Sequence, residues 1–359
     1  MASPIAYLAW GRPQRPRANL IQTLHTVEAL AETWGAVTLY LPPVPRRFDM
    51  AAFLRGMGIR HAIDLHPTAL LHRRWGGWPF VLMNDRNLRR AAAIYTRGPE
   101  LSLVLAKAHL AHYLEIHDTA TLAARQGLPK LLQAMQDGWL KGIVAISSAG
   151  REALVGAGFP ADQIHVVPSG VDIASFEGIP PLTAAEVSAG VGTYVGRISH
   201  DRGLPILEAM AAAGVTVHLT GPVDDLPRQD LNTLVVHPRV AHAEVPTQVA
   251  AGAFALMPYQ PELQHAASIS PIKLFEAMAA GRIVLASDLP ALREVIRSGE
   301  NGVLLPPDDP GAWIHALHRL QAAPDAALAM AAKARQDARS YTWQRRAEHL
   351  VDILAGSPS

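Results

Sequence analysis

Short β-like runs alternate with longer helical patterns along this chain, and that order constrains its fold more than any other feature. Strands separated by helices pair in parallel through crossover connections, so the pattern predicts doubly wound α/β sheets. A first set of strands is expected at residues 5–9, 37–41, 61–65, 113–116, 143–146 and 164–167. A second set is expected at residues 193–195, 215–219, 234–236, 254–257 and 283–286.

The stretch Phe-Glu-Gly-Ile-Pro-Pro at 176–181 punctuates the chain between these two sets, as a linker would. A chain of 359 residues is long enough for two domains of roughly 150–200 residues each. We therefore expect Rossmann-like domains over 1–180 and 181–341 that face each other across a cleft. Open α/β sheets bind ligands at the carboxyl ends of their strands, so the cleft is the expected site.

Composition excludes several kinds of chemistry. The chain has no cysteine, and so it has no disulfide, thiol nucleophile or thiolate metal site. No apolar run approaches the ~18–20 residues of a membrane span, and the N-terminus lacks the order of a signal peptide, so a cytoplasmic location is expected.

The charge is unevenly distributed. Residues 1–180 carry 18 Lys and Arg against 13 Asp and Glu, and residues 181–359 carry 14 against 18. The basic first half could face an anionic partner or lie peripherally at the inner face of a membrane, and a solvated face is the alternative. No nucleic-acid partner is expected.

The most informative segment begins at Ser270 and Pro271, which fit the N-cap and first position of a helix that stops at Gly281. The first amides of a helix have no intrahelical partner and its dipole is positive there, so a diphosphate would fit this end. Glu276 in the following turn could accept hydrogen bonds from both ribose hydroxyls. The alternative is an ordinary capped helix with Leu274 in the core and Glu276 exposed.

The run Ser-Pro-Ile-Lys-Leu-Phe-Glu-Ala-Met-Ala-Ala-Gly at 270–281, together with 286–290, Glu294 and 300–306, resembles the donor half of family-4 glycosyltransferases of GT-B fold. The resemblance implies transfer of a sugar from a nucleotide-diphosphate sugar to a saccharide, lipid-linked or small-molecule acceptor, with retention of configuration. It places the distal phosphate on the amides of Ile272 and Lys273 and the ribose on Glu276. Ser268 stands where many members have a glutamate that touches the transferred sugar, which leaves the sugar open.

Two arginines follow the first strand of the second domain, in Val-Gly-Arg-Ile-Ser-His-Asp-Arg-Gly at 195–203. The resemblance places Arg197, and Arg202 in place of a lysine, on the diphosphate, where fixed cations would stabilise the charge that grows as the sugar departs. Two solvated arginines are the alternative. No Asp-x-Asp occurs in the chain, so no metal or other cofactor is expected. The expected donor-site set is Gly11, Gly196, Arg197, Arg202, Val240, Ser268, Ser270, Ile272, Lys273, Leu274 and Glu276.

In the first domain, Glu115 and His117 end a strand. The resemblance makes them a catalytic Glu-x-His pair beside the donor sugar, and a structural histidine is the alternative. A zinc site built from His109, His112 and His117 is disfavoured because the first two straddle a break between helix and strand.

The loop at 10–18 is basic and retains one glycine, Gly11, where the resembling enzymes have a glycine-rich loop that borders both substrates. Arginines at this position could bind a phosphorylated, acidic or lipid-linked acceptor, or they could be solvated. The expected acceptor-binding set is Arg12, Arg15, Arg17 and Asn19. The stretch 73–78, Arg-Arg-Trp-Gly-Gly-Trp, adds groups suited to a sugar or a membrane interface, or to the core.

The C-terminal helix, over about 342–359, resembles the helix that packs back on the first domain in this family. Two rival functions stay open at this point. A nucleotide-sugar epimerase of similar fold would bind the same donor, and a non-catalytic sugar-nucleotide-binding protein would bind it without turnover. The sequence names neither the base, the sugar, the acceptor nor the oligomeric state.

Overall fold

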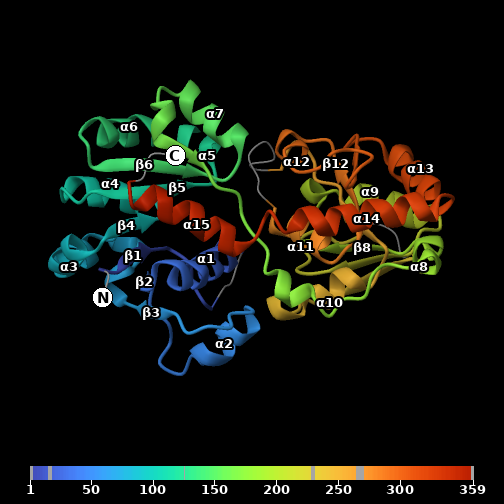
Figure 1. The fold of residues 1–359 in the computed structure, drawn as a ribbon, viewed down its shortest axis with the longest axis horizontal. Helices are drawn as coiled ribbons and strands as arrows, with labels where there is room; N and C mark the ends of the chain where they lie inside the picture. Colours follow the sequence, from blue (N-terminus) through green and yellow to red (C-terminus); the bar gives the residue numbers. More distant parts are fainter. Residues whose placement is uncertain (1–2, 15–17, 125, 228–230, 264–270, 357–359) are drawn as a thin grey trace. The chain divides into compact units, whose positions relative to one another are not determined.

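The computed structural model describes residues 3–14, 18–124, 126–227, 231–263 and 271–356 (Figure 1). The chain divides into two compact domains, Met1–Gly170 with Trp343–Ser359, and Val171–Thr342. Each domain is a parallel sheet with helices on its faces, which is the doubly wound arrangement that the alternating sequence pattern predicts.

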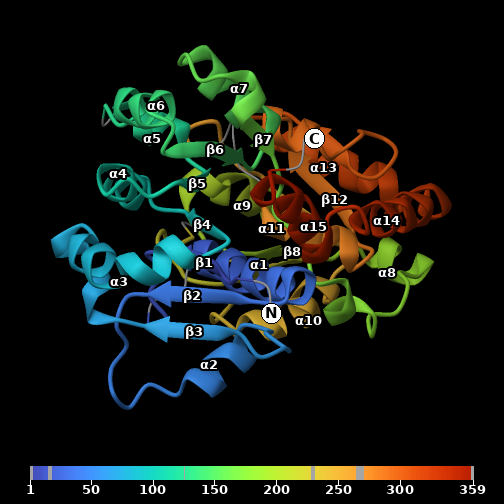
Figure 2. The same ribbon diagram turned by 60° about the vertical axis from the view of Figure 1, so that its left-hand side comes forward.

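The sheet of the first domain has seven strands in the described residues, in the order β3-β2-β1-β4-β5-β6-β7. The strands are β1 (Ile5–Leu8), β2 (Val37–Leu41), β3 (Asp64–Pro67), β4 (Ala93–Thr96), β5 (His112–Ile116), β6 (Leu140–Ala145) and β7 (Ile164–Val166). Figure 2 shows β3 beside β2, and β2 in turn pairs with β1. The strand order reverses between β1 and β4, so the loops at the carboxyl ends of these two strands flank a natural ligand position.

The helices of the first domain are α1 (Ala18–Trp34), α2 (Met50–Gly56), α3 (Trp78–Arg90), α4 (Pro99–Lys107), α5 (Thr119–Ala124), α6 (Leu128–Gln136), α7 (Ser148–Gly156) and α15 (Trp343–Leu354). Their starts follow local chemistry. Ser147 caps α7 by accepting a hydrogen bond from the Gly150 amide, and α4 begins with proline.

The sheet of the second domain has six parallel strands in the described residues, in the order β10-β9-β8-β11-β12-β13. The strands are β8 (Gly192–Val195), β9 (Val217–Thr220), β10 (Leu234–His237), β11 (Phe254–Met257), β12 (Ile283–Ser287) and β13 (Val303–Leu305). The helices are α8 (Ala184–Ala189), α9 (Leu204–Ala212), α10 (Val245–Ala250), α11 (Ile272–Ala279), α12 (Pro290–Arg293), α13 (Pro310–Gln321) and α14 (Pro324–Ala338). Here the order reverses between β8 and β11.

The structure corrects the expected strands at several places. Strand β13 was not predicted, and β9 begins at Val217 rather than at Val215. Strand β4 was not predicted, although all four of its residues are buried and it pairs with β1 at the centre of the sheet. It directly follows a basic helix end and an alanine run, so no turn signal marks its start. Strand β3 begins at Asp64 rather than at His61.

The structure also places the division between the domains earlier than the expected Pro180, after Gly170. Phe176, Ile179 and Leu182 are buried in the core of the second domain, which explains the shift. The Gly-Ile-Pro-Pro segment at 178–181 is therefore a turn within the second domain and not a linker between domains.

Helix α15 is the C-terminal element of the first domain and lies beside α1 (Figure 1). The ring of Trp343 stacks on His25 of α1, with 5.4 Å between their centroids. Arg346 of the same helix is only 3% exposed, and its guanidinium reaches Thr26, the carbonyls of Val167 and Pro168, and the Glu115 carboxylate at 2.7 Å. A buried ion pair thus joins the C-terminal helix α15 to strand β5.

We expect Arg346→Met to destabilise the first domain by about 3–5 kcal/mol, because it leaves the buried Glu115 carboxylate without its main counter-charge. Arg345→Met, on the exposed side of the same helix, is the matched control and should change the free energy of unfolding by less than about 0.5 kcal/mol. Urea denaturation measures both. Adding Glu115→Gln should restore part of the loss, and equal stability of the two single variants would contradict the assignment.

Candidate functional site

The start of α11 differs from its expected form. The helix begins at Ile272, and Pro271 occupies the N-cap position with extended backbone and no side-chain cap, whereas the sequence favoured Ser270 as the cap. Ser268 and Ser270 lie outside the described residues. The Leu274 amide donates to the Pro271 carbonyl at 2.9 Å, so the amides of Ile272 and Lys273 precede the first intrahelical bond.

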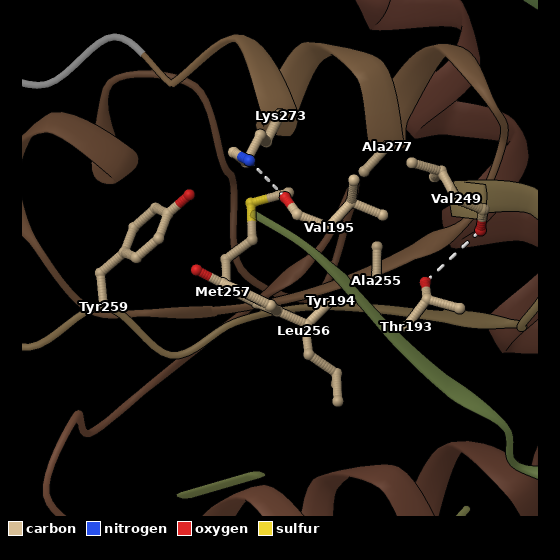
Figure 3. A pocket seen from close by; sticks show the side chains of 10 residues that line it. All are labelled: Thr193, Tyr194, Val195, Val249, Ala255, Leu256, Met257, Tyr259, Lys273 and Ala277. Carbon is tan, nitrogen blue, oxygen red and sulfur yellow. Dashed lines mark hydrogen bonds between the residues drawn. The ribbon is translucent and has the colours of Figure 1, made fainter. Parts of the chain in front are cut away.

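Lys273 points from this first turn toward the carboxyl end of β8. Its ammonium donates a hydrogen bond to the Val195 carbonyl, as Figure 3 shows. Gly196 follows, and a side chain there would collide with Lys273, since a Cβ would lie 2.6 Å from Nζ. Burial lowers the pKa of Lys273 to about 8; Glu276 opposes this shift and the positive charge of Arg202 adds to it.

Arg202 is the second cation at this edge of the sheet. Its guanidinium lies over the Tyr259 ring, 5.9 Å from the centroid, and its buried Nε has no hydrogen-bond partner among the described residues. The next residue, Gly203, has a φ of +83°, and a Cβ there would lie 1.9 Å from the Pro258 carbonyl, so only glycine fits. The structure therefore brings Arg202 and Lys273 together at the ends of β8 and β11.

Arg197 does not join this pair of cations. Its side chain is 46% exposed and forms an ion pair with Asp224 at 2.5 Å. Two further donor-site candidates in this domain have apolar side chains in the core: Val240 is partly buried, and Leu274 is fully buried. Leu274 can therefore contribute only its main chain to a ligand.

Glu276 is 4% exposed, so the alternative of an exposed helix carboxylate is wrong. The Nε2 atom of His242 lies 3.6 Å from its Oε1 atom. His242 was not predicted, because a single histidine in a polar turn carries no pattern. His242 lies near the Glu276 carboxylate, and Lys273 interacts with it electrostatically.

The first domain has a cavity of about 230 Å³ at the carboxyl ends of β1, β4 and β5. Four of the sequence candidates line it: Gly11, Asn19, Glu115 and His117. Two further lining residues, Trp10 and Arg97, were missed. Arg97 directly follows β4, and since that strand was not predicted, nothing marked its next residue as a strand-end position.

Glu115 is the buried anchor of this cavity, with a fully covered carboxylate. It accepts hydrogen bonds from Gln22 at 2.9 Å, from the Tyr95 hydroxyl at 2.5 Å and from His117. Burial alone would raise the pKa of Glu115, but Arg346, His117 and Arg97 outweigh it and hold the pKa well below its usual range. These neighbours thus favour the ionised form of Glu115.

His117 is held neutral between two charged neighbours. Burial, helped by Arg97, lowers the pKa of His117 to about 4. Arg97 can only donate, so it bonds Nδ1 as acceptor at 3.1 Å, and Nε2–H donates to the ionised Glu115. Both ring nitrogens are therefore engaged, and neither residue is placed as a free base in this arrangement.

The three histidines of the zinc alternative have separate partners. His112 is fully buried, donates from Nδ1 to the Leu110 carbonyl at 2.9 Å and accepts from the Ser102 hydroxyl at 2.6 Å. His109 stacks on Trp139, with 4.8 Å between ring centroids. Within the described part of the chain, no three His, Cys, Asp or Glu side chains are grouped as metal ligands.

The expected acceptor-binding residues fall into different places. Asn19 lies at the first cavity, with its carbonyl bonded by Arg97. Arg12 lines a second hollow of about 250 Å³ with Gln14, Pro42, Pro43 and His72. Arg15 and Arg17 lie outside the described residues.

Comparison with known proteins identifies the second domain most clearly. Residues 190–323 match the family described as Glycosyl transferases group 1. The chain is 36% identical over 84 residues to a D-inositol 3-phosphate glycosyltransferase of Corynebacterium urealyticum, covering 23% of this chain and 20% of that protein. It is 30% identical over 212 residues to a phosphatidyl-myo-inositol mannosyltransferase of Mycolicibacterium smegmatis, covering 56% and 54%. The chain thus spans about half, or less, of the curated relatives it matches.

Two solved structures resemble the whole chain. Anabaena Alr3699/HepE in complex with UDP superposes with a TM-score of 0.73 at 17% identity, covering 98% of this chain and all (100%) of that one. Sucrose-phosphate synthase from Thermosynechococcus elongatus superposes with a TM-score of 0.74 at 18% identity, covering 98% of each chain.

The chain therefore has the two-domain, Rossmann-like GT-B fold that was expected. Residues 190–323 match Glycosyl transferases group 1, which confirms the predicted resemblance to GT-B glycosyltransferases. Membership of family 4 stays a prediction.

The buried neutral histidines predict a pH dependence. Burial lowers the pKa of His112 to about 4, from an unfolded value near 6.5, so the unfolded chain binds a proton first as the pH falls. The stability of the first domain should therefore decline from pH 6.5 to 4.5, with His112 accounting for about 2–3 kcal/mol. Urea midpoints measured across this range should fall less steeply in His112→Asn than in the wild type. His66→Asn, at a side chain 55% exposed, should keep the wild-type slope, and parallel slopes for all three proteins would contradict the assignment.

Proposed function

We propose that this chain is a glycosyltransferase whose second domain holds a nucleotide-diphosphate sugar. The observation that carries the proposal is the convergence of Lys273 and Arg202 beside Gly196 and the first amides of α11. Their mutual repulsion contributes to the lowered pKa of Lys273, and a diphosphate between them would relieve it. The growing charge of a departing nucleotide is stabilised by the same cations.

The nucleoside is proposed to bind through Glu276. Its buried carboxylate can accept hydrogen bonds from both hydroxyls of a ribose, and the Nε2 atom of His242 lies 3.6 Å from one carboxylate oxygen. The Alr3699/HepE structures contain UDP, in one case with glucose, and so UDP-sugars are the first donors to test. Arg197 would have to leave Asp224 to reach the diphosphate, and we propose that Arg202 has the larger role.

For the acceptor, we propose a polyol such as a saccharide or an inositol phosphate, bound at the cavity of the first domain. Two curated relatives act on inositol-type acceptors by name. The cavity offers Asn19, Arg97 and the wall of Trp10 to hydroxyl groups, and Arg12 beside His72 supplies a cation for a phosphorylated acceptor. Lipid-linked acceptors remain within this class.

We further propose that transfer retains the anomeric configuration and needs no metal. His117 and Glu115 hold each other in fixed protonation states, which supports a positioning role rather than a role as base. The proton of the acceptor hydroxyl would then pass to the leaving diphosphate as the glycosidic bond breaks. Lys273 and Arg202 would neutralise the negative charge of that diphosphate.

A panel of UDP, GDP, ADP, CDP and TDP tests the donor site by thermal shift. At least one should raise the melting temperature, and its sugar conjugate should release free nucleotide faster when myo-inositol phosphate or a saccharide is added. Stabilisation by none of the five would overturn the donor-site assignment. An epimer formed from the donor alone would favour the epimerase, and binding without any turnover would favour a non-catalytic binding protein.

Glu276→Gln should weaken binding of the stabilising nucleotide about ten- to hundred-fold, because a charged acceptor of two hydroxyls is replaced by a neutral one of similar shape. Isothermal titration measures the change. Glu177→Gln, at an exposed position of the same domain, is the matched control and should bind normally. Equal affinities would show that Glu276 does not hold the nucleotide.

We also propose that the first domain lies peripherally on an anionic membrane. The exposed apolar side chains Trp75, Trp78, Leu82 and Met83 gather on and just before α3, with exposed fractions of 50%, 37%, 69% and 75%. Arg86 and Arg90 continue the four-residue spacing of Trp78 and Leu82, so one stripe is apolar at its start and cationic at its end. None of the described helices has the length and hydropathy needed to span a bilayer.

Flotation with vesicles tests this proposal. The chain should bind vesicles that contain phosphatidylglycerol more than vesicles of phosphatidylcholine alone, and Leu82→Glu with Met83→Glu should lower binding at least roughly ten-fold. Leu226→Glu replaces a side chain that is 78% exposed in the second domain and serves as control. The proposal would be refuted if the partition coefficient changed neither with the substitutions at α3 nor with the lipid charge.

A further inference from the structure

A second group of unneutralised positive charges lies at the opposite edge of the sheet in the second domain. Arg282 immediately precedes β12, and so it lies at the amino edge, whereas Lys273 and Arg202 lie at the carboxyl edge. Arg282 is 1% exposed, yet its Nε and Nη1 contact no hydrogen-bond acceptor among the described residues. A buried guanidinium with two unpaired nitrogens is unfavourable, and binding of a counter-ion would stabilise it.

The neighbours of Arg282 supply little compensation. Glu186 attracts its charge, but the Glu186 carboxylate is on an exposed residue and caps α8 by accepting from the amide and hydroxyl of Thr183, at 2.8 and 2.6 Å. Arg335 repels it. Arg335 donates one bond to the Phe176 carbonyl at 3.1 Å, which leaves most of its guanidinium for another acceptor.

A cavity of about 530 Å³ lies between α14 and the segment that leads into α8, and it is lined by Arg335 and by Gly281, the residue before Arg282. Its lining is basic at one side, with Arg335 and Arg339, and apolar at the other, with Leu182 and Leu328. None of the lining residues is acidic. Gly281 brings the backbone close: a Cβ there would lie 3.2 Å from Cδ of Arg335, so a side chain would crowd the arginine.

We infer that this cavity is a second ligand site, which takes a small phosphate monoester. The phosphate oxygens accept from Arg335 and Arg339 and neutralise the field of Arg282, and the organic part packs against Leu182 and Leu328. The site shares no residue with the Lys273 and Arg202 cations, so both can be occupied together. It stands independently of the proposed transferase activity.

The test titrates the full chain with inorganic phosphate and with glycerol 3-phosphate, and follows amide hydrogen exchange. Saturable protection is expected at residues 181–183 and along α14, with glycerol 3-phosphate binding more tightly than phosphate because only it has an organic part. Arg282→Met and Arg335→Met should each reduce affinity at least ten-fold, by loss of a cation. Arg319→Met, an exposed substitution on α13, and Arg202→Met, at the other cations, should leave it unchanged.

Two results would overturn the inference. One is unchanged phosphate affinity in both Arg282→Met and Arg335→Met. The other is protection confined to α11 and residues 196–203, which would show that the anion uses only the first group of cations. Without phosphate, Arg282→Met should be at least as stable as the wild type, because an apolar side chain of similar length replaces an unpaired charge. A marked loss of stability would instead make Arg282 a structural cation.

Discussion

The buried pair of Glu115 and Arg346 is the interaction on which the first domain most depends. One carboxylate joins β5 to the C-terminal helix and, through its hydrogen bonds, fixes Gln22, Tyr95 and His117. An unpaired carboxylate in this position would be costly, so α15 must be docked before the cavity acquires its final form. The last helix of the sequence is thereby part of the architecture of a site formed near its beginning.

This dependence also sets the chemistry of the cavity. Arg346 and Arg97 keep Glu115 ionised, and burial together with Arg97 keeps His117 neutral. The two residues form a rigid polar wall whose protonation does not change near neutral pH. Such a wall could orient hydroxyl groups without taking up a proton, which agrees with the proposed use of the leaving diphosphate.

The sequence predicted architecture better than side-chain partners. Short strand-like runs that alternate with longer helical patterns predict two doubly wound domains, since strand and helix periods are local properties. Strand β4 was not predicted, because four buried residues after an alanine run give no periodic signal. Arg97, which follows this strand, was therefore not recognised as a site residue. The sequence also did not predict the roles of His242, Asp224 and Arg346. Their contacts join segments distant in the chain, as Glu115 and Arg346 do, and no local pattern encodes them.

The resemblance places both Arg197 and Arg202 on the diphosphate. In the structure they differ in whether a carboxylate neutralises their charge. Arg197 has a carboxylate partner at the surface, as Arg346 has in the core. Arg202 and Lys273 have no carboxylate as a direct ion-pair partner in the described residues, and neither has Arg282. A cation neutralised within the chain serves the fold, whereas one left unneutralised at a ligand position lowers the stability of the empty protein and is stabilised when an anion binds. The same reasoning that supports the proposed diphosphate at the carboxyl edge of the second sheet therefore supports the inferred phosphate at its amino edge.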